Sequence, residues 1–271
     1  MWRVVRCFVK GESMNPCFEN LNRIEFVMTY ACTGRCKHCS EGEHTSISAG
    51  GHIDGKTAAK AVRELCSRFK IDSIMTFGGE PLLLPDDVCE IHSAALKAGI
   101  PKRQIITNGY FSKDSKVIKS VAERLAKSGV NALLLSVDAF HQEHIPIEPV
   151  AEFALAAKAA GIPIKSQPAW LVSEQDDNPY NLQTREILAH FAQLGIQPSE
   201  GNVIFPEGNA LKYLAEYFNA ENLPHNPYVE DPCDIRAVCV SPDGRLLGGN
   251  INQSGIIDIL ERYKPPKGES I

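Results

Sequence analysis

The sequence predicts an α/β fold, an incomplete parallel (β/α)6 barrel that ends in a short hairpin and a helix. Two observations predict this fold. Short apolar runs alternate along the chain with segments whose apolar residues have helical spacing, and a glycine followed by an apolar residue ends four such units, at Gly99, Gly129, Gly161 and Gly195. Intervals of 30, 32 and 34 residues between these glycines fit one strand and one helix each. Strands that alternate with helices form a parallel sheet, which right-handed crossovers curl toward a barrel.

Six apolar runs are the expected strands of this sheet. They are residues 24–30, 73–77, 104–107, 132–136, 162–167 and 202–205. Short apolar runs of this kind are typical of strands buried in a parallel sheet. Six strand–helix units instead of eight leave the barrel incomplete.

The expected helices follow the strands and end at the glycines. Apolar residues recur at i, i+3, i+4 and i+7 in residues 62–69, 118–125 and 150–157, which indicates one buried face on each helix. A glycine just past a helix is the usual left-handed cap, because it adopts positive φ without a steric penalty.

The chain is expected to divide into three parts. Residues 1–22 form an N-terminal extension, residues 23–206 the partial barrel, and residues 207–271 a connector with a C-terminal extension. The run Ala237–Leu247 is a hairpin candidate with Pro-Asp-Gly as its turn, and Ile256–Tyr263 has a short helical pattern. Unpaired strand edges are usually covered, so we expect this extension to cover the open edge or mouth of the barrel.

Composition excludes several classes of protein. The chain has 271 residues, 44% of them hydrophobic, and a formal net charge of −5, which argues against nucleic-acid binding. No apolar run approaches the length that spans a bilayer, and the N-terminus lacks a signal-peptide core, so we expect a cytoplasmic protein. Nine cysteines in such a protein indicate metal or catalytic use of some of them rather than disulfides.

Three of the cysteines lie close together directly after the first expected strand. Cys32, Cys36 and Cys39 have the spacing C-x3-C-x2-C. Thiolates select iron–sulfur clusters, zinc or Cu(I), and three of them can hold three irons of a 4Fe–4S cluster while the fourth iron stays open. The same spacing also fits three ligands of a structural zinc, with His38 or a remote cysteine as the fourth.

A glycine pair follows the second expected strand. Gly78 and Gly79 precede Glu80 and Pro81, and glycines without side chains allow a backbone to approach a ligand closely. Strand ends are where α/β folds bind ligands, although a turn between strand and helix also carries Gly and Pro for shape alone.

With these two motifs on consecutive strands, residues 23–206 resemble the radical S-adenosylmethionine (SAM) superfamily. The resemblance implies one 4Fe–4S cluster on Cys32, Cys36 and Cys39, SAM as second cofactor, and a reductant such as flavodoxin or ferredoxin. It implies that reductive cleavage of SAM yields a 5′-deoxyadenosyl radical, which abstracts hydrogen from a small molecule, peptide or protein. In this family Gly78, Gly79 and Glu80 would hold the methionine amino group, and His38 would offer its backbone to the adenine.

Polar residues at the ends of the third and fourth expected strands extend the resemblance. Thr107 and Asn108 are similar to a T-N-G segment beside the cofactor, although Asn-Gly is also a common tight turn. Ser136 and Asp138 resemble an S-x-D segment that contacts the methionine or ribose. His141 and His144 are candidates for the substrate side of the pocket, for a metal site, or for solvated histidines.

Two further interpretations remain beside a radical SAM enzyme: a non-catalytic Fe–S or Zn protein for electron transfer or structure, and a degenerate fold that serves as a binding partner.

Cys233 and Cys239 resemble the auxiliary-cluster extensions of some radical SAM maturases, but glycines stand where a further cysteine commonly follows. We therefore expect no second cluster. The N-terminal extension, residues 1–22, is too short for a leader-peptide-binding domain, so modification of ribosomal peptides is a less favoured function.

Overall fold

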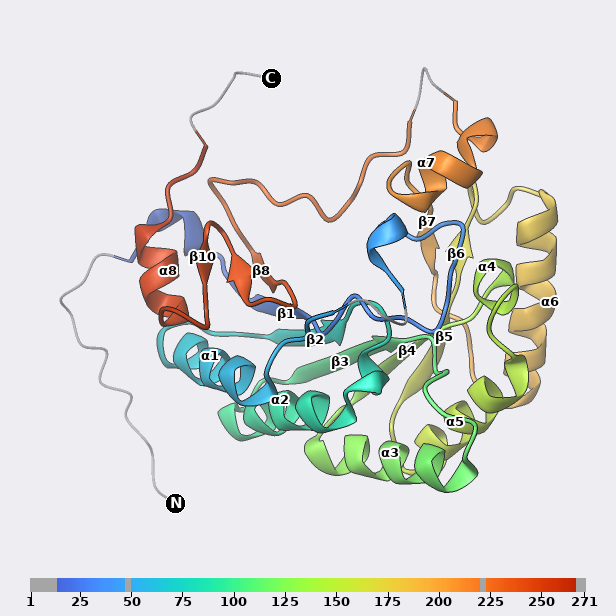
Figure 1. The fold of residues 1–271 in the computed structure, drawn as a ribbon, viewed down its shortest axis with the longest axis horizontal. Helices are drawn as coiled ribbons and strands as arrows, with labels where there is room; N and C mark the ends of the chain where they lie inside the picture. Colours follow the sequence, from blue (N-terminus) through green and yellow to red (C-terminus); the bar gives the residue numbers. More distant parts are fainter. Residues whose placement is uncertain (1–13, 47–49, 220–222, 267–271) are drawn as a thin grey trace.

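A computed structural model describes residues 14–46, 50–219 and 223–266. Most of the expected N-terminal extension, including Cys7, lies outside these residues, as does the end of the expected C-terminal tail. The described part is built around one open main sheet with helices packed on its outer side (Figure 1).

The main sheet has six parallel strands in the order β5-β4-β3-β2-β1-β8. Their bounds are β1 Arg23–Val27, β2 Ser73–Phe77, β3 Lys102–Thr107, β4 Ala132–Ser136, β5 Ile164–Gln167 and β8 Ala237–Val240. The sheet does not close, so the expected incomplete parallel barrel is confirmed.

The last expected barrel strand lies beside β5 but outside the main sheet. β7 (Asn202–Val203) pairs in parallel with β6 (Ala169–Trp170), and a single bridge joins Ser166 to Pro198 below them. Pro168 separates β5 from β6, and because proline has no N–H to donate it interrupts the ladder there. The expected strand 202–205 therefore does not join the main sheet. Its first two residues, β7, form a short separate pair with β6 that continues the curvature of the barrel.

The sixth strand of the main sheet comes from the C-terminal extension. β8 pairs in parallel with β1, with Arg23 opposite Ala237 and Glu25 opposite Cys239. The expected turn after it is present, since the Gly244 N–H donates to the Ser241 carbonyl at 2.8 Å. The strands on either side of that turn do not form the expected hairpin, however. The hairpin is formed instead by β9 (Arg245–Leu246) and β10 (Gly249–Asn250).

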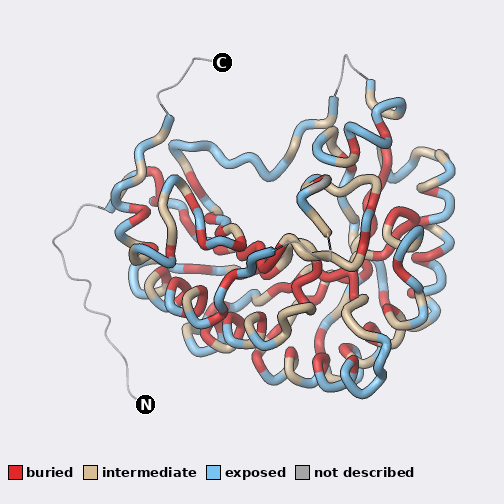
Figure 2. Tube along the Cα trace, in the orientation of Figure 1, coloured by how far each residue is buried: buried red, intermediate tan, exposed pale blue. Residues whose placement is uncertain are grey.

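The helices mostly cover the outer face of the sheet, although the short α7 lies on the open side, and the burial pattern follows them (Figures 1 and 2). Their bounds are α1 Gly55–Arg68, α2 Pro85–Ala98, α3 Ser115–Ser128, α4 Ala139–Gln142, α5 Ile147–Ala159, α6 Pro179–Gln193, α7 Asn209–Tyr213 and α8 Ile256–Arg262, with 3-10 turns η1 Pro16–Phe18, η2 Gly42–His44, η3 Pro81–Leu83 and η4 Ala215–Tyr217. Strand residues that face the helices, such as Ile24, Phe26 and Ile105, are fully buried. The opposite face of the sheet lies toward the open side of the molecule.

The helix ends confirm the role of the repeated glycines. Gly99 and Gly129 cap α2 and α3 with φ of 80° and 92°, and Gly161 and Gly195 follow α5 and α6 with φ of 84° and 73°. Because side chains other than glycine rarely adopt these angles, each glycine ends its helix and turns the chain into the next strand.

Candidate active site

The loops that follow β1 and β2 are bound to each other at the carboxyl edge of the sheet. The Gly79 N–H donates to the Thr29 carbonyl at 2.7 Å, and the Glu80 N–H donates to the Ala31 carbonyl at 2.8 Å. A Cβ atom at Gly79 would lie 2.1 Å from the Ala31 carbonyl oxygen. Glycine is therefore required at position 79 for the two loops to meet, which places the cysteine loop beside the glycine pair.

The cysteine loop is held from its other side by the start of α7. Asn209 donates its backbone N–H to the Cys39 carbonyl at 2.9 Å and its side-chain amide to the Cys36 carbonyl at 3.1 Å. Within the loop, the Cys39 N–H donates to the Cys36 carbonyl at 3.2 Å. The three thiols are therefore carried on a loop whose backbone is fixed by residues about 170 positions away in sequence.

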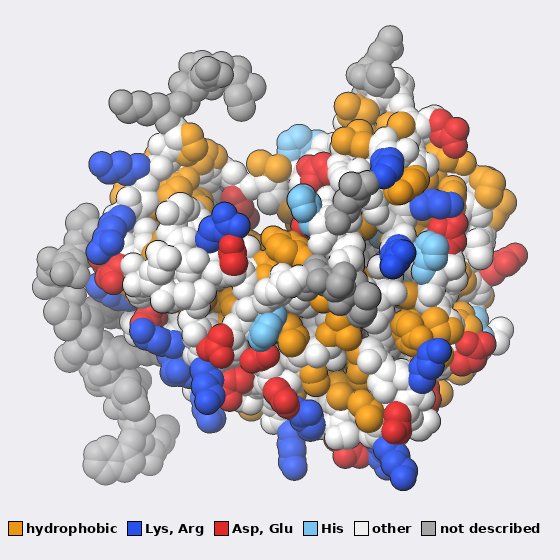
Figure 3. Space-filling model, viewed as in Figure 1, with side chains coloured by type: hydrophobic (Ala, Val, Ile, Leu, Met, Phe, Trp, Pro, Cys, Tyr) orange, Lys and Arg blue, Asp and Glu red, His pale blue; other side chains and the backbone are white. Residues whose placement is uncertain are grey.

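One cavity at this edge brings together most of the predicted site residues. The residues that line it include Cys32, Cys36, His38, Cys39, Gly78, Gly79, Thr107, Asn108, Ser136 and His141. The surface is hollowed above this edge, with apolar side chains at the floor of the hollow (Figure 3). Three strand-end loops and the cysteine loop thus face one space.

The donor atoms of the cavity fit a soft metal centre. Burial raises the pKa of the Cys32 thiol to about 12 and also raises the pKa of Cys39, so that neither thiolate is favoured without a nearby cation. Nδ1 of His38 is buried and has no hydrogen-bond partner among the described residues. Three thiols that line one cavity, with an unpaired polar atom in the same wall, are therefore suited to hold a thiophilic metal centre and a polar ligand.

Glu80 lies behind this cavity and not in its wall. Its side chain is fully buried, and its carboxylate accepts hydrogen bonds from the Thr107 hydroxyl at 2.6 Å, the Leu82 N–H at 2.8 Å and the Asn108 N–H at 2.8 Å. Burial raises the pKa of Glu80 to about 7, although these three donors favour the carboxylate. The contacts seen in the structure tie the loop after β2 to the end of β3.

Asp138 likewise lies behind the cavity and holds a residue that lines it. One carboxylate oxygen contacts Nδ1 of His141 at 2.9 Å and accepts the His141 N–H at 2.9 Å, and the other accepts the Ala169 N–H at 3.1 Å. Burial alone would raise the pKa of Asp138, but the adjacent imidazole lowers it to about 2. The carboxylate therefore stays ionised and fixes the His141 ring.

The imidazole of His141 lies beside the cysteine loop. Ligand atoms of Cys36, His38 and His141 all lie within 4.8 Å of one another, and the His38 and His141 rings are 5.0 Å apart. His144 is different: its side chain is 45% exposed and does not line the cavity. Of the two histidines predicted for the substrate side, only His141 faces the site.

Comparison with protein families identifies the chain. A model of the radical SAM superfamily matches residues 26–177, which is more than half of the chain and includes both motif loops. The chain belongs to the radical SAM superfamily.

Relatives of this radical SAM chain carry the names of different enzymes. It is 29% identical over 126 residues to a probable GTP 3′,8-cyclase of Methanocella arvoryzae, a match that covers 45% of this chain and 36% of the relative. It is 32% identical over 116 residues to the pre-heme d1 synthase of Dinoroseobacter shibae, covering 41% of this chain and 25% of the relative. The chain thus spans well under half the length of these two relatives.

Solved structures show that the fold is shared over nearly the whole chain. The structure of anSMEcpe with bound AdoMet superposes with a TM-score of 0.53 at 13% identity, covering 90% of this chain and 81% of that one. The structure of BtrN with AdoMet and 2-DOIA gives 0.51 at 15% identity, covering 89% and 82%. At these identities the likeness concerns the fold.

Several residues that line the cavity of the radical SAM chain had not been expected there. Asn202 and Phe205 come from the segment around β7, and Tyr228 comes from the connector before β8. The Tyr228 hydroxyl donates to the Asn202 side chain at 2.9 Å. The connector therefore crosses the open side and forms a wall of the cavity, a placement for which the sequence carries no local signal.

The two C-terminal cysteines lie in different surroundings. Cys239 is on β8 opposite Glu25, while Cys233 precedes that strand near Tyr263. The segment between these cysteines is extended alongside Cys17 and Arg23. The Ile235 N–H donates to the Cys17 carbonyl, and the Arg236 carbonyl accepts the Arg23 N–H. An extended chain rises about 3.3 Å per residue, so the two thiols do not converge on one site.

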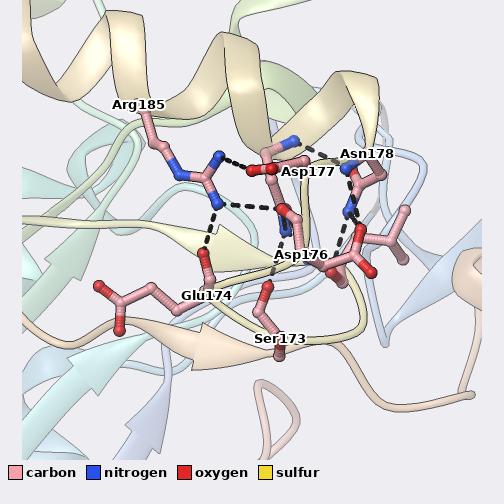
Figure 4. A network of polar contacts seen from close by, with 8 residues as sticks. Ser173, Glu174, Asp176, Asp177, Asn178 and Arg185 are labelled. Atoms are coloured by element: carbon pink, nitrogen blue, oxygen red, sulfur yellow. Dashed lines mark hydrogen bonds and ion pairs between the residues drawn. The ribbon is translucent and has the colours of Figure 1, made fainter.

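The loop that follows β6 is bound by side chains of α6. Arg185 of α6 donates to the Glu174 and Asp176 carbonyls at 2.7 Å and 3.0 Å and pairs with the Asp177 carboxylate at 2.8 Å (Figure 4). Buried Asn181 binds further carbonyls of the same loop. Several backbone carbonyls of this loop are therefore satisfied by two side chains of α6.

No helix within the described residues combines the length and the apolar character that crossing a membrane requires.

Proposed function

We propose that this chain is a radical SAM enzyme in which Cys32, Cys36 and Cys39 hold one 4Fe–4S cluster and the neighbouring strand ends hold SAM. The observation that carries the proposal is the convergence of the three thiols and the Gly78–Gly79 backbone on one cavity, fixed by the hydrogen bonds between their loops. When bound and reduced, such a cluster would supply the electron that splits SAM into methionine and a 5′-deoxyadenosyl radical able to abstract hydrogen. Radical SAM enzymes require an external reductant, for which flavodoxin or ferredoxin is our proposal.

The residues of the cavity divide into those that bind and those that orient. We propose that the cysteine thiolates bind iron, and that backbone groups of Gly78 and Gly79, with Ser136, receive the polar end of SAM. His38, whose Nδ1 has no partner among the described residues, lies where it can contact the rest of that ligand. Thr107 and Asn108 complete this side of the wall.

We propose indirect roles for two residues that the resemblance places on the cofactor itself. Glu80 and Asp138 are fully buried, and protein donors occupy both oxygens of each carboxylate. Glu80 then sets the position of Asn108, and Asp138 sets the orientation of His141. Because Glu80 is fully buried, direct contact with the methionine amino group would require a rearrangement that opens one of its carboxylate oxygens to the cavity.

The substrate is proposed to bind between the cysteine loop and the wall formed by Asn202, Phe205 and Tyr228. These residues line the cavity on elements outside the matched region 26–177. His141 is the candidate group on the substrate side, since it lines the same cavity.

A second candidate function is a non-catalytic metal site. Cys36, His38 and His141 place three ligand atoms within 4.8 Å of one another, a set that also suits zinc. This alternative uses two histidines in place of Cys32 and Cys39 and predicts a mononuclear site.

Metal analysis of protein purified without oxygen tests the proposal. We expect iron and acid-labile sulfide in equal amounts, about four of each per chain, and their loss in Cys32→Ala and Cys39→Ala. Cys89→Ala, on α2 and away from the cavity, is the matched control and should retain both. One tightly bound zinc without sulfide, unaffected by Cys32→Ala, would instead establish the second candidate.

A further inference from the structure

The side chain of Asn108 donates toward the sulfur of a proposed cluster ligand. Its Nδ2 lies 3.6 Å from Sγ of Cys32 and 3.1 Å from the Thr33 hydroxyl oxygen. Asn108 is only 5% exposed and follows the end of β3, whereas Cys32 follows β1. A buried amide from one strand end thus reaches the thiol carried by another.

Surrounding contacts fix which way this amide points. Oδ1 of Asn108 accepts the Tyr110 N–H at 2.8 Å, so the oxygen faces its own loop and the NH2 group faces Cys32. The Asn108 backbone N–H donates to Glu80 at 2.8 Å, which anchors the residue from behind. The donor is therefore held against the sulfur before any metal is bound.

We propose that Asn108 is a positioning residue that donates an amide hydrogen bond to the Cys32 sulfur and thereby raises the reduction potential of the cluster. This inference rests on the proposed cluster site. Hydrogen bonds to the sulfurs are among the factors that set the potential of an iron–sulfur cluster. The partial positive charge of an N–H stabilises the reduced cluster, which carries one more negative charge, more than the oxidised one. Asn108 does not titrate, so the effect is present at every pH at which the protein is folded.

Two substitutions separate this role from a purely structural one. Asn108→Asp retains the acceptor for the Tyr110 N–H but removes the donor facing Cys32. Asn108→Leu has a similar size and removes the donor without adding charge. In a potentiometric titration followed by electron paramagnetic resonance, both variants should have a more negative midpoint potential than wild type. At a fixed potential we expect the ratio of reduced to oxidised cluster to fall about tenfold in Asn108→Leu, which corresponds to 59 mV for one electron.

Asn131→Asp is the matched control. Asn131 makes the same kind of bridge, accepting the Arg103 N–H at 2.8 Å and donating to the Pro101 carbonyl at 2.8 Å, but it precedes β4 at the opposite edge of the sheet. Its substitution adds the same charge far from the cysteines and should leave the midpoint potential unchanged.

A measurement on the unsubstituted protein decides the case in which the variants lose their cluster. Wild-type protein labelled with ¹⁵N in the asparagine side-chain amides should show a weakly coupled ¹⁵N signal in hyperfine spectra of the reduced cluster, and the signal should persist in Asn209→Ala, which removes the other asparagine amide bound to the cysteine loop. An unchanged potential in cluster-containing Asn108→Leu, or absence of that coupling in the wild type, overturns the inference. Failure of the wild type to assemble any iron–sulfur cluster would instead refute the proposed function.

Discussion

The Glu80 carboxylate accepts the backbone N–H of Asn108 at 2.8 Å and so joins the loop after β2 to the end of β3. The same carboxylate accepts the Thr107 hydroxyl and the Leu82 N–H. A residue of a ligand-binding motif is often assumed to touch the ligand, but here the motif glutamate organises the protein groups that line the cavity. Its substitution should therefore disturb the fold of the site as well as ligand binding.

Glu80→Ala is expected to destabilise the protein, because it leaves three buried donors without an acceptor. A buried unsatisfied donor costs about 1–3 kcal/mol, and partial relaxation gives an expected loss of roughly 2–4 kcal/mol in the free energy of unfolding. Urea denaturation measures this loss. Glu148→Ala, an exposed position on α5, is the control and should change stability by less than about 0.5 kcal/mol. Equal stability of the two variants would mean that the three contacts of Glu80 contribute nothing.

The titration of Glu80 predicts a pH dependence of stability. Burial raises its pKa from 4.5 to about 7, so between these values the folded state holds a proton that the unfolded chain has lost. The stabilising contribution is full below pH 4.5 and is lost as pH rises through 7. Between pH 5 and pH 8, wild type should lose up to about 3 kcal/mol more unfolding free energy than Glu80→Gln, which cannot titrate. Parallel pH profiles of the two proteins would contradict this assignment.

Gly79→Ala is expected to separate the loops after β1 and β2. The added Cβ would lie 2.1 Å from the Ala31 carbonyl oxygen, which is a backbone atom and cannot rotate away. We expect a loss of about 1–3 kcal/mol in stability and a clear loss of bound iron after reconstitution. Gly50→Ala, where a Cβ meets no atom within 4 Å, provides the comparison and should retain both. Full iron content and stability in Gly79→Ala would show that the two loops need not meet.

Cys233 and Cys239 are expected to contribute nothing to iron binding, because their thiols lie in different surroundings on either side of an extended segment. The Cys233→Ala, Cys239→Ala double variant should therefore contain about four irons per chain, as wild type does. About eight irons in wild type, falling to four in the double variant, would reveal a second cluster that these cysteines serve.

Local sequence patterns predicted most of the sheet and the cavity but not the edge of the sheet. The run 73–77 and the run 132–136 became β2 and β4 with the same bounds, because apolar strands between helices have few alternatives. Ala237–Val240 was expected to pair with the residues after its turn. Its partner is β1, more than 200 residues earlier, and no local pattern encodes so distant a pairing.

In the candidate site, too, local patterns predicted what neighbouring residues form, but not what depends on distant segments. The spacing of Cys32, Cys36 and Cys39 placed three thiols in one cavity, because a short loop keeps neighbours together. The buried positions of Glu80 and Asp138 were not foreseen, since they depend on where the backbone N–H groups of other loops point. Tyr228 reaches the cavity through the path of the connector, which has no periodic pattern to read.

Cleavage of SAM is the most direct test of the central claim. Protein reconstituted without oxygen and reduced with dithionite should convert SAM to methionine and 5′-deoxyadenosine in equal amounts, as measured by liquid chromatography and mass spectrometry. Cys36→Ala should form neither product, and Cys89→Ala should form both. Wild-type protein that carries a reduced 4Fe–4S cluster and binds SAM, yet forms no 5′-deoxyadenosine, would contradict the account.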